Sequence, residues 1–234
     1  MKKYKLIILG SLFSLTACAG FLGSKTIEDG TNSPSKDFDT VNGSIKVGSS
    51  ANVGDLSTVN GSIKVSSSSS IGEASTVNGS ITFAENVKAE SAETVNGSIK
   101  LGNSCDIEEN VETVNGSITT NSDCVIHENI ETVNGSIKLH NSEIQGDIET
   151  VNGNIYLLQG SSVDDIIIHK PNKGWFNNSK NKAPKVILGK NAEINGGLEF
   201  NRKVKLYIHD SVGIDSDIEN AEIINYSGDE KPYQ

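Results

Sequence analysis

Cys105 and Cys124 form the pair of residues with the clearest potential for chemistry in this chain. Each stands ten residues after a valine of the same recurring motif, Val95 and Val114. In a coiled chain with that period they lie one above the other, with Cα atoms about 4.8 Å apart, within the disulfide range. We predict a disulfide between them. The alternative is two buried thiols, because inward side chains stacked in register have parallel Cα–Cβ directions, which disfavour the bond.

Four glutamates stand directly before successive copies of that motif: Glu93, Glu112, Glu131 and Glu149. In a stack of coils they form a column of like charge, which is mildly destabilising unless it is screened or bridged. A divalent cation such as Ca²⁺ would be a suitable bridge, because hard cations prefer carboxylate oxygens. The favoured interpretation is a solvated face with Lys100 and Lys138 nearby, so we predict no metal site.

The other side chains able to do acid–base chemistry are scattered. The four histidines, His127, His140, His169 and His209, do not share a column at the repeat period, apart from the similar strand ends that carry the last two. Two adjacent acids, Asp164 and Asp165, would point to opposite faces of a strand and so would not form a catalytic pair. We therefore predict no catalytic residue and no cofactor.

A recurring hexapeptide, Thr-Val-Asn-Gly-Ser-Ile, sets the positions of these residues. Copies begin at Thr40, Thr58, Thr76, Thr94, Thr113 and Thr132, and a seventh copy at Thr150 has asparagine in place of serine. Successive copies are 18 or 19 residues apart. A fixed short period of this kind is typical of a solenoid, in which each unit buries its apolar face by stacking on the next.

Each coil is expected to consist of three short strands. Apolar residues recur every six positions, as at Val41, Val47 and Val53, so three hexads make one coil of 18 residues. This spacing, together with the many Gly, Asn, Ser and β-branched residues, disfavours helix. We predict an all-β fold: a single-stranded, three-sided parallel β-helix with about 18 residues per coil. Parallel crossovers favour a right-handed coil, whereas hexads of the form Val-Gly-x-x-Ala/Ser resemble those of the left-handed hexapeptide acyltransferases.

Two local paths through the motif fit the sequence. An unbroken strand would point Val41, Gly43, Ile45 and Val47 to one face. Alternatively the chain bends at Asn42-Gly43, because Asn-Gly is a frequent turn pair. The residue pattern alone leaves both paths open.

The motif asparagines are predicted to stack into a ladder. Side-chain amides at one position of successive coils can hydrogen-bond along the stack. We interpret this ladder as structural, and it consists of Asn42, Asn60, Asn78, Asn96, Asn115, Asn134 and Asn152.

The 18-residue period continues beyond the last motif copy. Leu188, Leu206 and Ile224 maintain it, so we expect the solenoid to cover residues 39–226, followed by a polar tail at 227–234. The segment 170–184 is rich in Asn and Lys and reads as a loop extruded from one corner. Its Trp175 and Phe176 are a candidate partner contact, although packing of the loop onto the rod is the favoured role.

The amino terminus reads as a secretory signal. Residues 1–17 have a basic start and a short apolar run, which is too short for a comfortable membrane span. The ending Leu15-Thr16-Ala17-Cys18 resembles a bacterial lipoprotein box. That resemblance implies cleavage before Cys18, acylation of that cysteine and attachment to the membrane, to the outer one in a host with two. We expect residues 18–38 to carry the lipid and form a flexible tether.

The charge of the chain argues against some partners. It has 20 basic and 30 acidic residues, and removal of residues 1–17 takes away three lysines and no acid, which leaves a formal net charge of −13. Such a balance disfavours nucleic acid and anionic lipid surfaces as partners of the domain. Attachment to a membrane would therefore depend on the lipid at Cys18.

The repeat resembles known bacterial families. The hexapeptide resembles the repeats of adhesin-like proteins with β-helical heads, and the hexad rhythm resembles bactofilins, which are polymer-forming scaffold proteins. The resemblance implies a non-enzymatic lipoprotein of the cell envelope that serves as a scaffold or contact surface for a glycan or an envelope protein. Two alternatives stay open: an enzyme of the same fold acting on polysaccharide or acyl groups, and a polymer-forming element.

Overall fold

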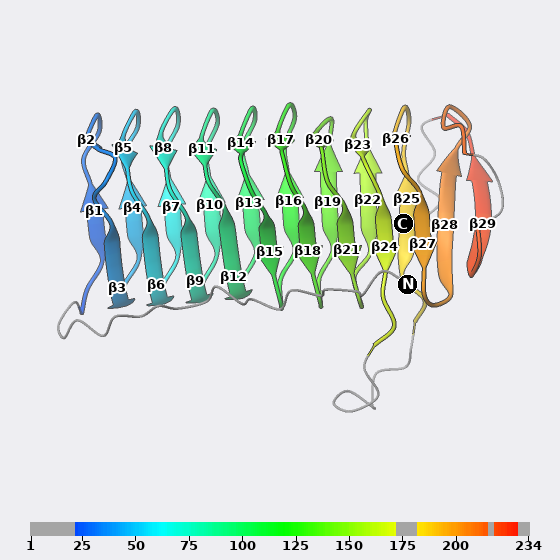
Figure 1. The fold of residues 1–234 in the computed structure, drawn as a ribbon, viewed down its shortest axis with the longest axis horizontal. Helices are drawn as coiled ribbons and strands as arrows, with labels where there is room; N and C mark the ends of the chain where they lie inside the picture. Colours follow the sequence, from blue (N-terminus) through cyan, green and yellow to red (C-terminus); the bar gives the residue numbers. More distant parts are fainter. Residues whose placement is uncertain (1–21, 172–181, 215–217, 229–234) are drawn as a thin grey trace.

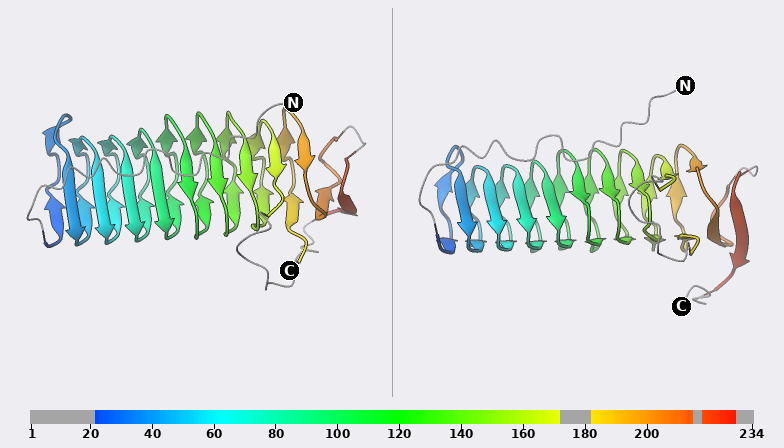
Figure 2. Two further views of the ribbon diagram at one scale, coloured as in Figure 1. Left: turned by 60° about the horizontal axis from the view of Figure 1, so that its bottom comes forward. Right: turned by 90° about the horizontal axis from the view of Figure 1, so that it is seen from below.

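The chain folds into a β-solenoid. The computed structural model describes residues 22–171, 182–214 and 218–228, and all the regular structure in these ranges is β-strand. Each coil from β1 to β27 contributes one strand to each of three parallel sheets, which run side by side along a straight rod (Figure 1). Figure 2 shows the same single row of coils from two other sides. The predicted all-β, three-sided parallel β-helix is thus confirmed.

Sheet A contains the first half of the hexapeptide. Its strands pair in parallel, and in the coils that carry the hexapeptide they begin two residues before the motif threonine. They are β3 (Phe38–Asn42), β6 (Leu56–Asn60), β9 (Ala74–Asn78), β12 (Ala92–Asn96), β15 (Val111–Thr113), β18 (Ile130–Thr132), β21 (Ile148–Thr150), β24 (Ile166–Ile168) and β27 (Leu198–Phe200).

Sheet B begins with the motif isoleucine in the coils that carry the hexapeptide. Its strands are β1 (Lys25–Ile27), β4 (Ile45–Val47), β7 (Ile63–Val65), β10 (Ile81–Phe83), β13 (Ile99–Leu101), β16 (Ile118–Thr120), β19 (Ile137–His140), β22 (Ile155–Leu158), β25 (Lys185–Leu188), β28 (Val204–His209) and β29 (Ala221–Tyr226). Only this sheet continues to β28 and β29, where the strands lengthen to six residues.

Sheet C is made of two-residue strands. They are β2 (Asn32–Ser33), β5 (Asn52–Val53), β8 (Ser70–Ile71), β11 (Lys88–Ala89), β14 (Asp106–Ile107), β17 (Val125–Ile126), β20 (Glu143–Ile144), β23 (Ser162–Val163) and β26 (Glu193–Ile194). The residue that lengthens a coil from 18 to 19 lies at the corner that follows this sheet, because β14 and β15 are separated by one residue more than β11 and β12.

The chain bends inside the hexapeptide. In the first four motif coils the sheet A strand ends at the asparagine, and in the last three it ends at the threonine. Sheet B strands begin at the isoleucine in all seven, so the Gly-Ser pair lies in the corner between the two sheets. As a result the threonine, not the valine, faces the core: Thr40 is 5% exposed, whereas Val41 is 42% exposed. The apolar six-residue register had placed the valines with the core residues. That part of the prediction is wrong, because alternation in sheet A is set by Phe38 and Thr40 and starts again after the bend.

The core is a stack of apolar columns inside the three sheets. The first position of the sheet B strands is occupied by one fully buried isoleucine per coil, and in-register parallel pairing places each directly over the last. Burial of such side chains supplies most of the stability of a fold of this kind, at about 1.5–3 kcal/mol each. This column consists of Ile45, Ile63, Ile81, Ile99, Ile118, Ile137 and Ile155.

Two corners are fixed by polar residues. Between sheets B and C one residue per coil has a positive φ, for example Ser50 at 56° and Asp123 at 62°. Most of these residues are Asn, Asp or Ser, and Asn and Asp in particular tolerate the left-handed conformation. Between sheets C and A a side-chain oxygen accepts the backbone N–H of the next coil, as Asp37 Oδ1 does from Asp55 at 3.0 Å.

The solenoid begins earlier than the sequence predicted. β1 pairs with β4 and β2 pairs with β5, so much of the segment expected to be a flexible tether, 18–38, is a coil. The prediction of a tether is wrong for these residues. This first coil lacks the hexapeptide, but Ile27 supplies its buried position and Asp29 accepts the N–H of Ser49 at 2.7 Å. Residues 1–17 and Cys18 lie outside the described residues, as does most of the predicted tail.

Candidate functional site

The hexapeptide is used almost entirely for stacking. The threonine hydroxyl faces inward and donates to the glycine carbonyl of the coil below, as Thr113 does to Gly97 at 2.9 Å. The serine backbone N–H donates to the serine hydroxyl below, as between Ser117 and Ser98 at 3.3 Å. A side chain on Gly116 would overlap with the carbonyl of Gly97. Only the valine, which points outward, has no such role.

The seven motif asparagines form a continuous amide ladder on the outside of the rod. Each Nδ2 donates to the Oδ1 of the asparagine one coil below, from Asn60 to Asn42 at 2.9 Å up to Asn152 to Asn134 at 2.9 Å. The bonds between them, through Asn78, Asn96 and Asn115, measure 2.9–3.0 Å. The second amide hydrogen of each residue is left pointing away from the ladder.

The outer surface of sheet A carries the four glutamates, which we term the acidic column. Parallel pairing stacks Glu93, Glu112, Glu131 and Glu149 in register. The solvated face expected from the sequence is wrong, since Glu112 is 6% exposed and Glu131 8%. Burial, followed by the charges of neighbouring glutamates, raises the pKa of Glu112 to about 7 and that of Glu131 to about 8. This column can therefore hold protons near neutral pH.

His169 ends the acidic column. Its Nε2 lies 2.6 Å from Oε2 of Glu149, and both side chains are largely buried. Above Glu149 the next residue on the sheet is Ile167, so the column does not continue. Within the described ranges no group of three or more His, Cys, Asp or Glu has the geometry to hold a metal ion. The column is thus suited to sharing protons and offers no calcium cage.

The outer surface of sheet B has the opposite charge. The residue after each motif isoleucine points outward and lines up as Lys46, Lys64, Thr82, Lys100, Thr119 and Lys138, which we term the lysine column. Its four lysines are exposed. Lys100 and Lys138 were expected near the glutamates, but the bend at Gly-Ser moves them to another sheet. The sequence signal was present, because lysine or threonine follows the first six hexapeptides.

The lysine column ends at an aromatic residue. Tyr156 occupies the next position, and the Nζ atom of Lys138 lies 5.7 Å from its ring centroid. Beyond it Ile187 and Tyr207 are buried, so the accessible part of the column runs from Lys46 to Tyr156.

Cys105 and Cys124 are stacked in adjacent coils, but they are free thiols. The predicted disulfide is wrong. Each thiol donates to a backbone carbonyl, Cys105 to Ala84 at 3.2 Å and Cys124 to Gly102 at 2.9 Å. Contact with Cys124, and then burial, raises the pKa of Cys105. In-register stacking keeps the Cβ atoms near the coil spacing, which is longer than a disulfide allows, and both residues act as small core side chains.

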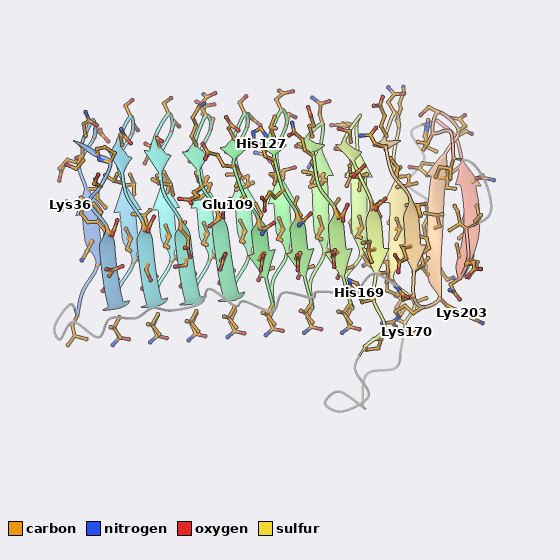
Figure 3. All side chains as sticks on the ribbon, in the orientation of Figure 1. Lys36, Glu109, His127, His169, Lys170 and Lys203 are labelled. Carbon is orange, nitrogen blue, oxygen red and sulfur yellow. The ribbon has the colours of Figure 1, made fainter. Side chains whose placement is uncertain are left out.

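The histidines are separate and each contacts neighbouring groups. His127 and His169 lie at opposite edges of the rod (Figure 3). His127 bridges Asp106 at 2.9 Å and Gln145 at 3.0 Å, while Nδ1 of His140 lies 2.9 Å from the carbonyl of Thr120. His209 is buried and contacts the carbonyl of Gly228, which links β28 to the end of the described chain.

Two of the predicted site elements are not placed by the structure. Cys18, Trp175 and Phe176 lie outside the described residues. In the described part of the chain no helix has the length and apolar character needed to cross a bilayer. Comparison of the sequence and fold with protein-family models, with curated proteins and with solved structures found no match.

Proposed function

We propose that this chain is a non-enzymatic lipoprotein of the bacterial cell envelope whose β-solenoid serves as an adhesin-like contact surface or scaffold. One observation carries the proposal: side chains of one kind recur in coil register along the outside of the rod. Asparagines line one corner, lysines line sheet B and glutamates line sheet A. Periodic rows of this kind suit a repetitive partner, because each coil repeats the same contact.

The placement of the polar residues also supports a role in contact. Four of the six hexapeptide residues, Thr, Asn, Gly and Ser, are engaged in joining one coil to the next. The cysteines are core residues and the histidines bind neighbouring groups. The chemistry of these side chains is thus used for building the rod, and the exposed outer face of sheet B is left for recognition.

The proposed attachment is through lipid. By its resemblance to a lipoprotein box, Leu15 to Cys18 directs cleavage and acylation at Cys18, which anchors the rod to the membrane, the outer one where there are two. The partner at the faces is a glycan or another envelope protein, with Trp175 and Phe176 of the 170–184 loop as a further contact. Nucleic acid is not a proposed partner, given the net charge of −13.

Cell fractionation of the wild type and of Cys18→Ser tests the proposal. We expect the wild type in the membrane fraction, with an acylated Cys18 as the first residue in mass spectrometry of the amino-terminal peptide. Cys18→Ser should leave the membrane fraction or retain its signal. A wild-type protein that is soluble and unacylated would overturn the proposed anchoring.

A further inference from the structure

The lysine column presents positive charge in a single line along the rod. The four lysines are exposed, and three of them, Lys46, Lys64 and Lys100, have no ion-pair or hydrogen-bond partner in the described part of the chain. Lys138 lies over the ring of Tyr156. At about 4.8 Å per coil the line is roughly 24 Å long. From Lys64 onward the lysines are two coils apart, about 10 Å, which is comparable with a disaccharide unit of an extended polysaccharide.

Neutral hydrogen-bonding groups flank this line on both sides. At the corner toward sheet A lies the amide ladder, with one spare N–H on each asparagine. At the corner toward sheet C lie Ser49, Asn103 and Asn141, which are exposed. The acids on that corner are few over these coils, namely Glu85 and Asp123. Amides and hydroxyls beside a row of ammonium groups match the hydroxyls and acid groups of a charged sugar chain.

Sparse charge favours a polysaccharide over other polyanions. Duplex DNA carries one charge per about 1.7 Å of its axis, and an anionic membrane presents a dense sheet of charge. The overall negative charge of this protein repels such partners strongly. A polysaccharide with a charge on every sugar or every second sugar is repelled less and matches lysines about 10 Å apart. The column also offers no apolar side chain between Lys46 and Lys138 for insertion among lipids.

We propose that the outer face of sheet B, from Lys46 to Tyr156, binds a linear anionic polysaccharide laid along the rod axis. The lysines pair with its acid groups, the asparagine ladder hydrogen-bonds its hydroxyls, and Tyr156 packs against a sugar ring at one end. This inference rests on the proposed contact function and specifies its partner class and its surface.

The test measures binding of polygalacturonate to the full chain in detergent. The test variant carries Lys46→Thr, Lys64→Thr, Lys100→Thr and Lys138→Thr together. Threonine already occupies two positions of the same column, so the coils should tolerate it. We expect the dissociation constant to rise about tenfold or more, and wild-type binding to weaken as salt is added. The same four positions changed to arginine should retain binding.

A matched control removes four lysines from other surfaces: Lys36, Lys88, Lys190 and Lys203. All four are exposed, and Lys36 and Lys203 lie at opposite ends of the rod (Figure 3). This control has the same net charge as the test variant and should bind polygalacturonate within about twofold of the wild type. Circular dichroism of each variant checks that the solenoid is intact.

Several outcomes would overturn the inference. They are equal binding by the test variant and the wild type, an equal loss in the control, equal binding of a neutral dextran of the same length, or binding to phosphatidylglycerol vesicles and not to polygalacturonate. None of these affects membrane attachment through Cys18. Conversely, a soluble, unacylated protein would remove the proposed anchoring while leaving the polysaccharide measurement valid.

Discussion

Sheets A and B carry charged side chains at equivalent outer positions of the same coils, yet the two sets are in different environments. On sheet A, Glu112 and Glu131 are more than nine-tenths buried and stand directly over one another. On sheet B, Lys100 and Lys138 are exposed and a threonine separates them. Both columns follow from the same repeat.

The difference shows that the repeat determines where a side chain lies, whereas its burial and neighbours determine whether an acidic group is protonated. On sheet A, burial and like charge raise the pKa of Glu131 to about 8, so that carboxyl is mostly protonated at neutral pH. The lysines of sheet B are exposed to solvent. The formal charge of −10 therefore overstates the negative charge of the folded chain at neutral pH.

The corner between the two sheets should be the most sensitive point. Gly116→Ala would place a methyl group against the carbonyl of Gly97 and shift both faces out of register. We expect a loss of about 3 kcal/mol in the free energy of unfolding. Denaturant titration measures it, with Gly213→Ala as the control, because no atom lies within 4 Å of a Cβ at that site. Equal stability of the two variants would contradict the stacking role of the corner glycine.

The acidic column should make the stability of the rod depend on pH. The folded-state pKa values of about 7 and 8 lie above the ordinary value of 4.5, so the folded protein binds more protons than the unfolded chain in this range. The contribution is complete below pH 4.5 and is lost as the pH rises through 8. Glu131→Gln should raise stability at pH 9 by on the order of 1–2 kcal/mol and change little at pH 4.

Thermal unfolding of Glu131→Gln across this pH range provides the measurement. Lys138→Thr is the comparison variant on sheet B, and it should show the same pH dependence as the wild type. A flat profile for the wild type between pH 5 and 9 would contradict burial of the glutamates.

The contributions of the inward and outward side chains of sheet A to stability can be distinguished by substituting two neighbouring residues. Thr113→Val removes the inward hydroxyl that donates to Gly97 and should cost about 1 kcal/mol. Val114→Thr makes the reciprocal change on the outer side and should alter stability by less than about 0.5 kcal/mol. Chemical denaturation of both variants measures the difference. A larger cost for the outer change would mean that the valine, not the threonine, supports the stack.

The smallest effect is expected on sheet B. Lys100→Thr extends a column that already has threonine at positions 82 and 119. Its melting temperature should match that of the wild type, with a difference in stability below about 0.5 kcal/mol. A marked loss of stability would show that this lysine supports the fold and is not held for a partner.

The architecture could be predicted from the sequence because its repeat is long and regular. Seven hexapeptides at a fixed period leave few alternatives to a three-sided stack, and the isoleucine column follows directly from them. The first coil was not predicted because its strands, Lys25–Ile27 and Asn32–Ser33, lack the hexapeptide. They pair with the next coil through backbone hydrogen bonds. Backbone pairing leaves little trace in side-chain patterns.

The candidate site was harder to predict because it depends on where the chain bends. A turn at Gly43-Ser44 puts Thr40 inside, Val41 outside and Lys46 on a different sheet from Glu93. An unbroken strand through the motif would instead point Val41 inward and Thr40 outward. The disulfide prediction was wrong for a related reason. Equivalent positions in adjacent coils bring the two cysteines close together but do not give their side chains the directions that a disulfide bond needs.

The hydrogen bonds of the sheets have a mechanical consequence. They run from coil to coil along the rod, as from Ile118 N–H to the Ser136 carbonyl at 3.0 Å. A tensile load applied at the two ends would therefore strain them in series, and only one coil's set would have to give way at a time. Under such a load the molecule should lengthen in small steps, one turn of chain per step, and rewind when the force is released.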